Sequence, residues 1–148
     1  MTRYRAFPAP LIALGGLLVA VMTAACDNSL TGPSQFAAFS QTDLRVGTGA
    51  TAVVGNTITV HYTGWLYNAT QPEQKGPVFE TSLGRGPFTF VLGAGQVIQG
   101  WDQGIPGMNV GGVRRLVVPP SLSYGQTRYG IIPPNATLVF EVELLELR

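Results

Sequence analysis

Residues 57–66 and 137–147 of this chain alternate apolar and polar side chains with a period of two. In the first run, Ile58, Val60 and Tyr62 fall on one face, and threonines and a histidine fall on the other. Side chains of a β-strand point to its two faces in turn, whereas those of a helix repeat about every 3.6 residues. The pattern therefore predicts two strands that each bury one face against a core.

Further strands are predicted elsewhere beyond residue 42. Residues 113–118 are rich in β-branched side chains, and Phe88 and Phe90 share one face of another short run. Clusters of Gly, Pro and Asn, which favour turns, separate these runs. We therefore expect at least five strands.

Only residues 97–105 have a pattern that favours a helix, and that helix must be short. Gly100 and Gly104 each cost about 1 kcal/mol relative to alanine in a helix, and Pro106 ends it. One short helix beside several strands predicts an α+β domain in which a single sheet wraps the helix.

The first 25 residues predict a signal peptide that takes no part in the fold. Arg3 and Arg5 precede an uncharged run at residues 11–25, and small residues stand directly before Cys26. A permanent membrane span is the less favoured interpretation, because it needs roughly 20 apolar residues and two prolines shorten this run.

The sequence Met22-Thr23-Ala24-Ala25-Cys26 resembles a lipobox, the cleavage site of bacterial lipoproteins. At such a site the thiol carries a diacylglyceryl group and becomes the new N-terminus, and two or three acyl chains give stable anchoring. The alternative is an ordinary secretory signal, cut after an alanine, that leaves Cys26 as a free thiol. We expect an exported, membrane-anchored lipoprotein, on the periplasmic side or in the cell envelope.

The mature chain is nearly neutral. The sequence has nine Lys and Arg and eight Asp and Glu, so losing Arg3 and Arg5 with residues 1–25 leaves a net charge of −1. No basic stripe remains for nucleic acid, and a single cysteine allows no internal disulfide. Residues 26–41 are predicted to form a flexible tether, because they show neither helical nor strand periodicity, and residues 42–148 the folded domain.

Six motifs of the folded domain follow one known pattern in order. They are VHYTG at 60–64, FETS at 79–82, PFTF at 87–90, VIQGW at 97–101, SYG at 123–125 and GIIPPNATLVF at 130–140. In these motifs the chain resembles the FKBP family of peptidyl-prolyl cis/trans isomerases. The resemblance implies an FKBP-like antiparallel half-barrel sheet wrapped around one short helix, with a shallow apolar pocket between the two.

The resemblance also implies roles for individual residues. Trp101 would form the pocket floor, and the Tyr124 hydroxyl and the Ile98 N–H would meet substrate carbonyls. The catalytic residues implied are Tyr62, Glu80, Ile98, Trp101, Tyr124 and Phe140. The substrate-binding residues implied are Phe79, Arg85, Phe88, Phe90, Val97, Ile131 and Ile132.

Such a pocket needs neither a nucleophile nor a cofactor. Rotation about an X–Pro bond has a barrier of about 18–20 kcal/mol from amide resonance, which is lost in the twisted transition state. A dry aromatic pocket favours that twisted, less polar form over the planar one. The aromatic residues could instead simply fill a core. A histidine-based nucleophilic site is disfavoured because the sole histidine, His61, points away from the face of Tyr62.

The resemblance implies proline-containing, unfolded or flexible polypeptides as substrates, here exported ones. It also implies macrolide immunosuppressants as inhibitors, and we expect a monomer that binds no nucleic acid and meets the membrane through its lipid anchor. The alternative function is a chaperone-like module that binds proline segments without turnover.

Three departures from the family pattern concern the pocket. Glu80 stands where the family usually has Asp, and Glu80 and Arg85 could be only a surface ion pair. The loop at residues 68–77 is longer than in compact members and is expected beside the pocket. Residues 126–129 are shorter, so that Arg128 or Tyr129 takes the place of the family's histidine.

Overall fold

The computed structural model describes residues 36–148. The predicted signal peptide, the lipidation site at Cys26 and residues 26–35 of the predicted tether lie outside the described residues. Among residues 36–148, no helix is both long enough and apolar enough to span a membrane.

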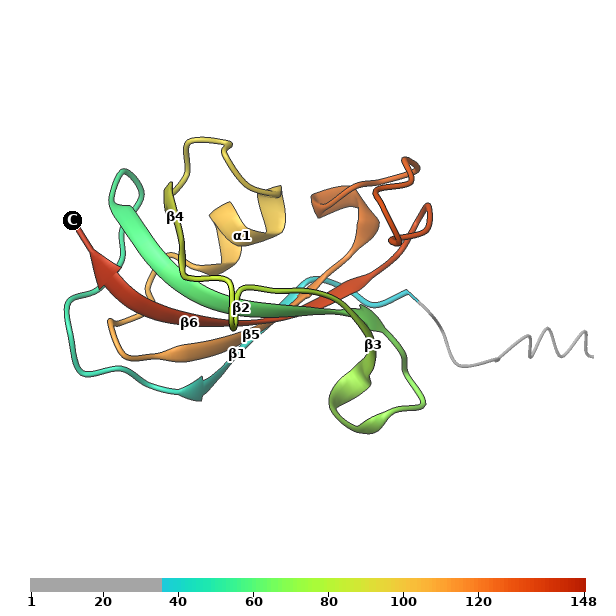
Figure 1. The fold of residues 1–148 in the computed structure, drawn as a ribbon, viewed down its shortest axis with the longest axis horizontal. Helices are drawn as coiled ribbons and strands as arrows, with labels where there is room; N and C mark the ends of the chain where they lie inside the picture. Colours follow the sequence, from blue (N-terminus) through green and yellow to red (C-terminus); the bar gives the residue numbers. More distant parts are fainter. Residues whose placement is uncertain (1–35) are drawn as a thin grey trace, which may run out of the picture. The chain divides into compact units, whose positions relative to one another are not determined.

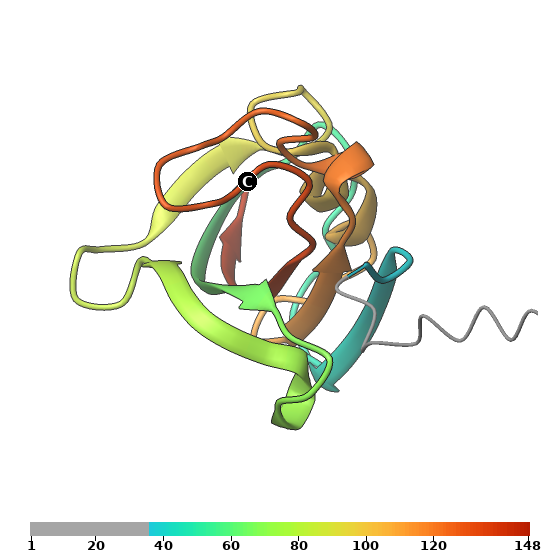
Figure 2. The same ribbon diagram turned by 90° about the vertical axis from the view of Figure 1, so that its right-hand side faces the viewer.

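The described chain forms one antiparallel sheet with one short helix (Figure 1). The strands and the α-helix are β1 Ser40–Arg45, β2 Thr57–Tyr67, β3 Lys75–Thr81, β4 Phe88–Val91, α1 Gln99–Gly104, β5 Val113–Val118 and β6 Leu138–Leu147. Two single-turn 3₁₀ helices, η1 Pro72–Gln74 and η2 Pro120–Leu122, lie in the loops. The strand order is β1-β5-β6-β2-β3, and β4 pairs with β2 beside β3. The predicted α+β class, with a sheet around a single short helix, is confirmed. Figure 2 shows how strongly the sheet curves.

The predicted faces of the two longest strands are also confirmed. Ile58 and Val60 of β2 are completely buried, as are Val142 and Leu144 of β6. Val139 departs from the alternation, because it is buried although it faces away from the helix. Its cross-strand neighbours are apolar side chains on both sides, from β2 and β5.

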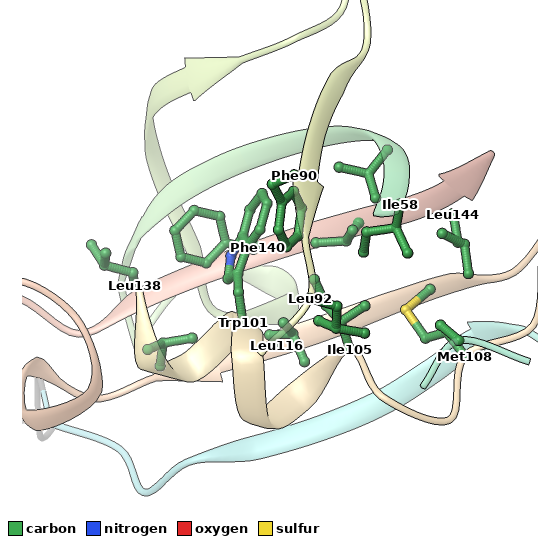
Figure 3. Packing of buried hydrophobic residues seen from close by; sticks show 14 of the residues in the cluster. Ile58, Phe90, Leu92, Trp101, Ile105, Met108, Leu116, Leu138, Phe140 and Leu144 are labelled. Atoms are coloured by element: carbon green, nitrogen blue, oxygen red, sulfur yellow. The ribbon is translucent and has the colours of Figure 1, made fainter. Parts of the chain in front are cut away.

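Helix α1 lies directly on β5, and its glycines allow this close approach. A β-carbon on Gly100 would lie only 2.4 Å from a methyl carbon of Val118, and one on Gly104 only 2.6 Å from Leu116. The residues that shorten the helix are thus the ones that let it reach the sheet. The core between them contains Trp101 together with side chains from all the inner strands (Figure 3).

The folded part begins earlier than predicted. Strand β1 begins at Ser40, two residues before the predicted domain, and Phe39 packs against the core beside Gly104. The sequence did not indicate β1 because all six of its residues are exposed, so it has no apolar face to alternate with a polar one.

The loop at residues 68–77 does not lie beside the pocket, so that expectation is wrong. It folds over the face of the sheet opposite α1 (Figure 1). There the Lys75 ammonium lies 2.7 Å from Glu73 and 2.6 Å from Glu141, and 4.5 Å from the ring centre of Trp65. These ionic and cation–π contacts with outward-facing sheet residues hold the loop away from the concave side.

Candidate functional site

A cavity of about 260 Å³ opens on the concave side of the sheet, over α1. Residues from four strands, from α1 and from two loops converge on it. Its lining comprises Tyr62, Glu80, Phe88, Gln96, Val97, Ile98, Trp101, Tyr124, Tyr129 and Phe140. Most of these side chains are aromatic or aliphatic, which suits an apolar ring better than a charged ligand.

Trp101 lies at the base of this cavity and is only 4% exposed. The ring of Tyr62 is 5.0 Å away at 80°, and that of Phe140 is 5.3 Å away at 86°. Such edge-to-face pairs are favourable arrangements of aromatic rings, so Tyr62 and Phe140 both support the Trp101 ring. Trp101 belongs to the core and to the cavity at once.

Two predicted residues lie behind the cavity. Phe90 is 3% exposed, stacks on Phe88 and contacts Trp101 at 5.7 Å, so it supports the lining without reaching the opening. Phe88 is 40% exposed, so Phe90 lies deeper in the fold than Phe88 does. Phe79 similarly contacts the edge of Phe140 at 5.6 Å and does not line this cavity.

A second cavity of about 230 Å³ adjoins the first and shares Glu80 and Tyr129 with it. The remaining predicted residues gather here, namely Phe79, Arg85, Ile131 and Ile132. The structure therefore distributes the predicted site residues between two neighbouring cavities, with Phe90 beneath the first.

The hydroxyl of Tyr62 is held in its neutral form. Burial, and then the negative charge of Glu80 beside it, raises the pKa of Tyr62 to about 12, although Arg85 opposes this weakly. No ion pair joins Glu80 to Arg85 within residues 36–148. Glu80, which lines the cavity itself, therefore interacts with Tyr62, and the interpretation as a surface ion pair finds no support.

The sequence left open whether Arg128 or Tyr129 takes the place of the histidine in the family pattern. Of the two, Tyr129 is the residue that lines the cavity. Its ring stacks on Tyr124, with centres 4.4 Å apart and planes 7° apart. Two backbone hydrogen bonds with Ile132, of 3.1 and 2.9 Å, hold Tyr129 in a tight turn that the positive φ of Gly130 permits. Burial, and then the neighbouring Tyr129 and Glu80, raises the pKa of Tyr124.

The backbone N–H of Ile98 is available at the cavity. Ile98 precedes α1 in extended conformation, and its carbonyl accepts a hydrogen bond from Trp101 N–H at 2.9 Å. Its own N–H has no acceptor among the described residues. A backbone donor left without a partner beside an apolar cavity is suited to a ligand carbonyl.

The loop that carries Ile98 is anchored by two residues that the sequence analysis did not select. The Asp102 carboxylate accepts hydrogen bonds from Gly93 N–H at 2.8 Å and Gly95 N–H at 3.0 Å. Gln96, which lines the cavity, accepts one from Val91 N–H at 2.9 Å. No sequence signal marks these partners, because Asn, Asp and Gln near glycines are common in any turn.

His61 lies away from the cavity, as its position in the strand predicts. Its Nδ1 is 2.9 Å from the hydroxyl of Ser82, which also accepts a hydrogen bond from Tyr62 N–H. Ser82 is 5% exposed and His61 is partly buried, and their contact joins β2 to the residue that follows β3. Within residues 36–148, no group of three or more His, Cys, Asp or Glu side chains could hold a metal ion.

Comparison with known proteins gives a consistent result. Residues 49–145 match the family model described as FKBP-type peptidyl-prolyl cis-trans isomerase. An FK506-binding protein of Neisseria meningitidis serogroup A is 52% identical over 107 residues, covering 71% of this chain and 92% of that protein. FK506-binding protein 1 of Dictyostelium discoideum is 48% identical over 109 residues, covering 72% and 95%.

Solved structures share the fold. The crystal structure of AtFKBP13 has a TM-score of 0.64 at 39% identity and covers 74% of this chain and 93% of its own. That of FkpA from Escherichia coli also has a TM-score of 0.64, at 36% identity, covering 74% of this chain and 48% of its own.

Proposed function

This chain belongs to the family of FKBP-type peptidyl-prolyl cis/trans isomerases, and from that premise we propose that the X–Pro bond rotates in the cavity over Trp101. The observation that carries the proposal is the aromatic enclosure itself. Trp101 forms its base, and Tyr62 and Phe140 stand perpendicular to it as walls. A pyrrolidine ring is a small apolar body of the kind that such walls accept.

The physical basis of catalysis is differential binding. Amide resonance, which gives the barrier of about 18–20 kcal/mol, also makes the planar bond strongly polar. The twisted bond has lost that resonance and is less polar. Moving it from water into an aromatic cavity therefore costs less free energy than moving the planar bond. The cavity therefore lowers the barrier without covalent chemistry.

Two donors orient the bound peptide. The N–H of Ile98 has no acceptor among the described residues, and Tyr124, whose hydroxyl makes no hydrogen bond among them either, also lines the cavity. Each would donate a hydrogen bond to a substrate carbonyl and hold one side of the bond while the other turns. Tyr62, whose pKa is about 12, remains a neutral hydroxyl throughout the physiological range.

The test is a titration with a short X–Pro peptide followed by heteronuclear NMR, beside a measurement of the isomerisation rate. The indole resonance of Trp101 and the amide resonance of Ile98 should shift as the peptide saturates. Trp65, which contacts Lys75 on the opposite face of the sheet, provides an internal control and should not move. Catalysed exchange with shifts confined to other surfaces would place the reaction elsewhere.

We also propose that the enzyme acts on exported proteins while anchored through Cys26. The support is the sequence alone: a basic start, an uncharged apolar run and small residues directly before the thiol. A Cys26→Ser variant should leave the membrane fraction. Mass spectrometry of the purified membrane-bound protein that found an unmodified thiol, with the N-terminus elsewhere, would refute the anchor.

A further inference from the structure

Arg114 is the one charged residue that is buried among residues 36–148, with 6% of its surface exposed. It lies on β5 between Val113 and Arg115, on the same face as the core residue Leu116. A guanidinium removed from water destabilises a fold unless its donors are satisfied, so its partners are informative.

Those partners come from two different elements. The guanidinium Nε lies 2.6 Å from Asp43 Oδ1 and its Nη2 lies 3.1 Å from Asp43 Oδ2, a two-pronged ion pair with β1. Its Nη1 donates to the carbonyls of Gly104 at 2.8 Å and Pro106 at 3.1 Å, at the C-terminal end of α1. Arg114 therefore joins the first strand to the end of the helix.

The end of α1 needs such a partner. The last carbonyls of a helix have no donors within it, and they carry the negative end of the helix dipole. A helix of only six residues is also too short to hold its own position, and no side chain caps its N-terminus. Its place on the sheet must therefore come from tertiary contacts.

The position of α1 sets the depth of the cavity. Trp101 stands one turn before Gly104, and its indole forms the cavity base. Gly104 itself packs on Leu116, so a shift at the helix end is passed through one rigid turn to the indole.

We propose that Arg114, oriented by Asp43, is a positioning residue for prolyl isomerisation, because it fixes the C-terminal end of α1 and thereby the height of Trp101 in the cavity. The inference rests on the proposed role of this cavity. The inference also gives β1 a role in catalysis, although no residue of β1 lines the cavity.

The experiment compares Arg114→Met and Arg114→Lys with Arg45→Met in the full chain. Arg45 is a matched control, because it likewise donates to a backbone carbonyl, that of Gly111, and to a carboxylate, that of Glu143, but none of these hydrogen bonds reaches α1. Arg114→Met should lower kcat/KM roughly tenfold and shift the Trp101 indole resonance, because small misplacements in a site are costly. Arg114→Lys keeps the positive charge but loses the two-pronged guanidinium, so its kcat/KM and its Trp101 shift should lie between those of the parent protein and Arg114→Met. Arg45→Met should change neither quantity.

Loss of stability must be separated from loss of position. Leu144→Ala truncates a completely buried residue of β6 outside the cavity, so it should lower the urea midpoint without shifting Trp101 in the folded protein. Asp43→Ala removes an exposed partner and leaves two Arg114 donors unpaired, so its urea midpoint should fall; in the folded protein Trp101 should shift in the same direction as in Arg114→Met but by less.

Folded Arg114→Met and Asp43→Ala with unchanged kcat/KM and an unchanged Trp101 resonance would overturn the inference. A failed proposal about the cavity looks different. In that case the substrate peptide would not shift Trp101 in the parent protein, whatever Arg114 does.

Discussion

At the scale of single residues, Trp101 is both part of the core and the base of the cavity, and these roles are separable by mutation. It contacts four aromatic rings and is nearly buried. Tyr124 is the contrasting case, because its hydroxyl makes no hydrogen bond within residues 36–148. The fold does not depend on that hydroxyl, whereas the proposed reaction does.

We therefore expect Trp101→Leu to lower stability by about 2–3 kcal/mol, because a large ring leaves the core. Its kcat/KM, corrected for the folded fraction, should fall as well. Tyr124→Phe should keep its stability but lose about 0.5–1.5 kcal/mol of transition-state binding, up to roughly tenfold in kcat/KM. Urea midpoints beside kcat/KM measure both. The roles assigned to Trp101 and Tyr124 are contradicted if the activity of Trp101→Leu falls only with its folded fraction and the kcat/KM of Tyr124→Phe is unchanged.

Glu80 should be detectable through the titration of Tyr62. Glu80→Gln removes the second cause of the raised pKa, so the pKa of Tyr62 should fall from about 12 toward its ordinary value but stay above it, because burial remains. The raised pKa stabilises the fold fully below about pH 10, the unfolded value, and that contribution is lost as the pH rises toward 12. NMR of ring-labelled tyrosine gives the pKa directly. An unchanged value in Glu80→Gln would mean that burial alone sets it.

At the scale of elements, the loop before α1 depends on Asp102. Its carboxylate binds two backbone N–H groups of residues 93–95, and the same loop ends at Ile98. Asp102→Ala should cost about 1 kcal/mol of stability, because both bonds are exposed, and should raise KM more than it lowers kcat. Hydrogen exchange of residues 93–98 should accelerate. Glu146→Ala, an exposed carboxylate at the far end of β6, serves as control, and equal exchange in both variants would show that Asp102 does not hold the loop.

The join between β1 and α1 should be sensitive to acid. The hydrogen bond with Arg114 holds the pKa of Asp43 below its ordinary value, against a smaller effect of burial. A lowered pKa stabilises the fold above the unfolded value of about 3.9, and this contribution is lost as the pH falls through the folded value. Asp43→Asn should therefore flatten the loss of stability below about pH 4 in acid titrations followed by circular dichroism. An identical acid profile in both proteins would contradict this.

At the scale of the whole molecule, one sheet and one short α-helix carry two adjoining cavities, the first of them lined by Trp101 of the helix. A relative that bears the name FK506-binding protein is 52% identical to this chain over 107 residues. We expect a macrolide of the FK506 type to fill the cavity over Trp101 and inhibit isomerisation. Cyclosporin should not inhibit, because its target has an unrelated fold.

Inhibition is measured with a short X–Pro peptide at increasing macrolide concentration. Trp101→Leu should weaken inhibition by the macrolide. Arg45 lies on the opposite face of the sheet, so Arg45→Met should leave inhibition unchanged. Inhibition by cyclosporin but not by the macrolide would contradict the cavity as the inhibitor site.

Much of the architecture follows from the sequence alone. Alternation determined which faces of β2 and β6 are buried, since period two permits only one of the two faces to meet the core. Gly100, Gly104 and Pro106 determined that the helix is short, because their effects on a helix are local. The motif order likewise indicated the family, because it depends on residue identities and not on their contacts.

Other features were decided only by tertiary structure. Lys75 reaches Glu141, and Arg114 reaches Asp43, across 66 and 71 positions of sequence, so no local pattern reveals either pair. Tyr129 gained its place in the cavity by stacking on Tyr124, which the length of a loop alone does not imply. The physical reason is the same in each case. Periodicity and propensity act over a few neighbouring residues, whereas charge pairing and ring stacking form wherever the folded chain brings two side chains together.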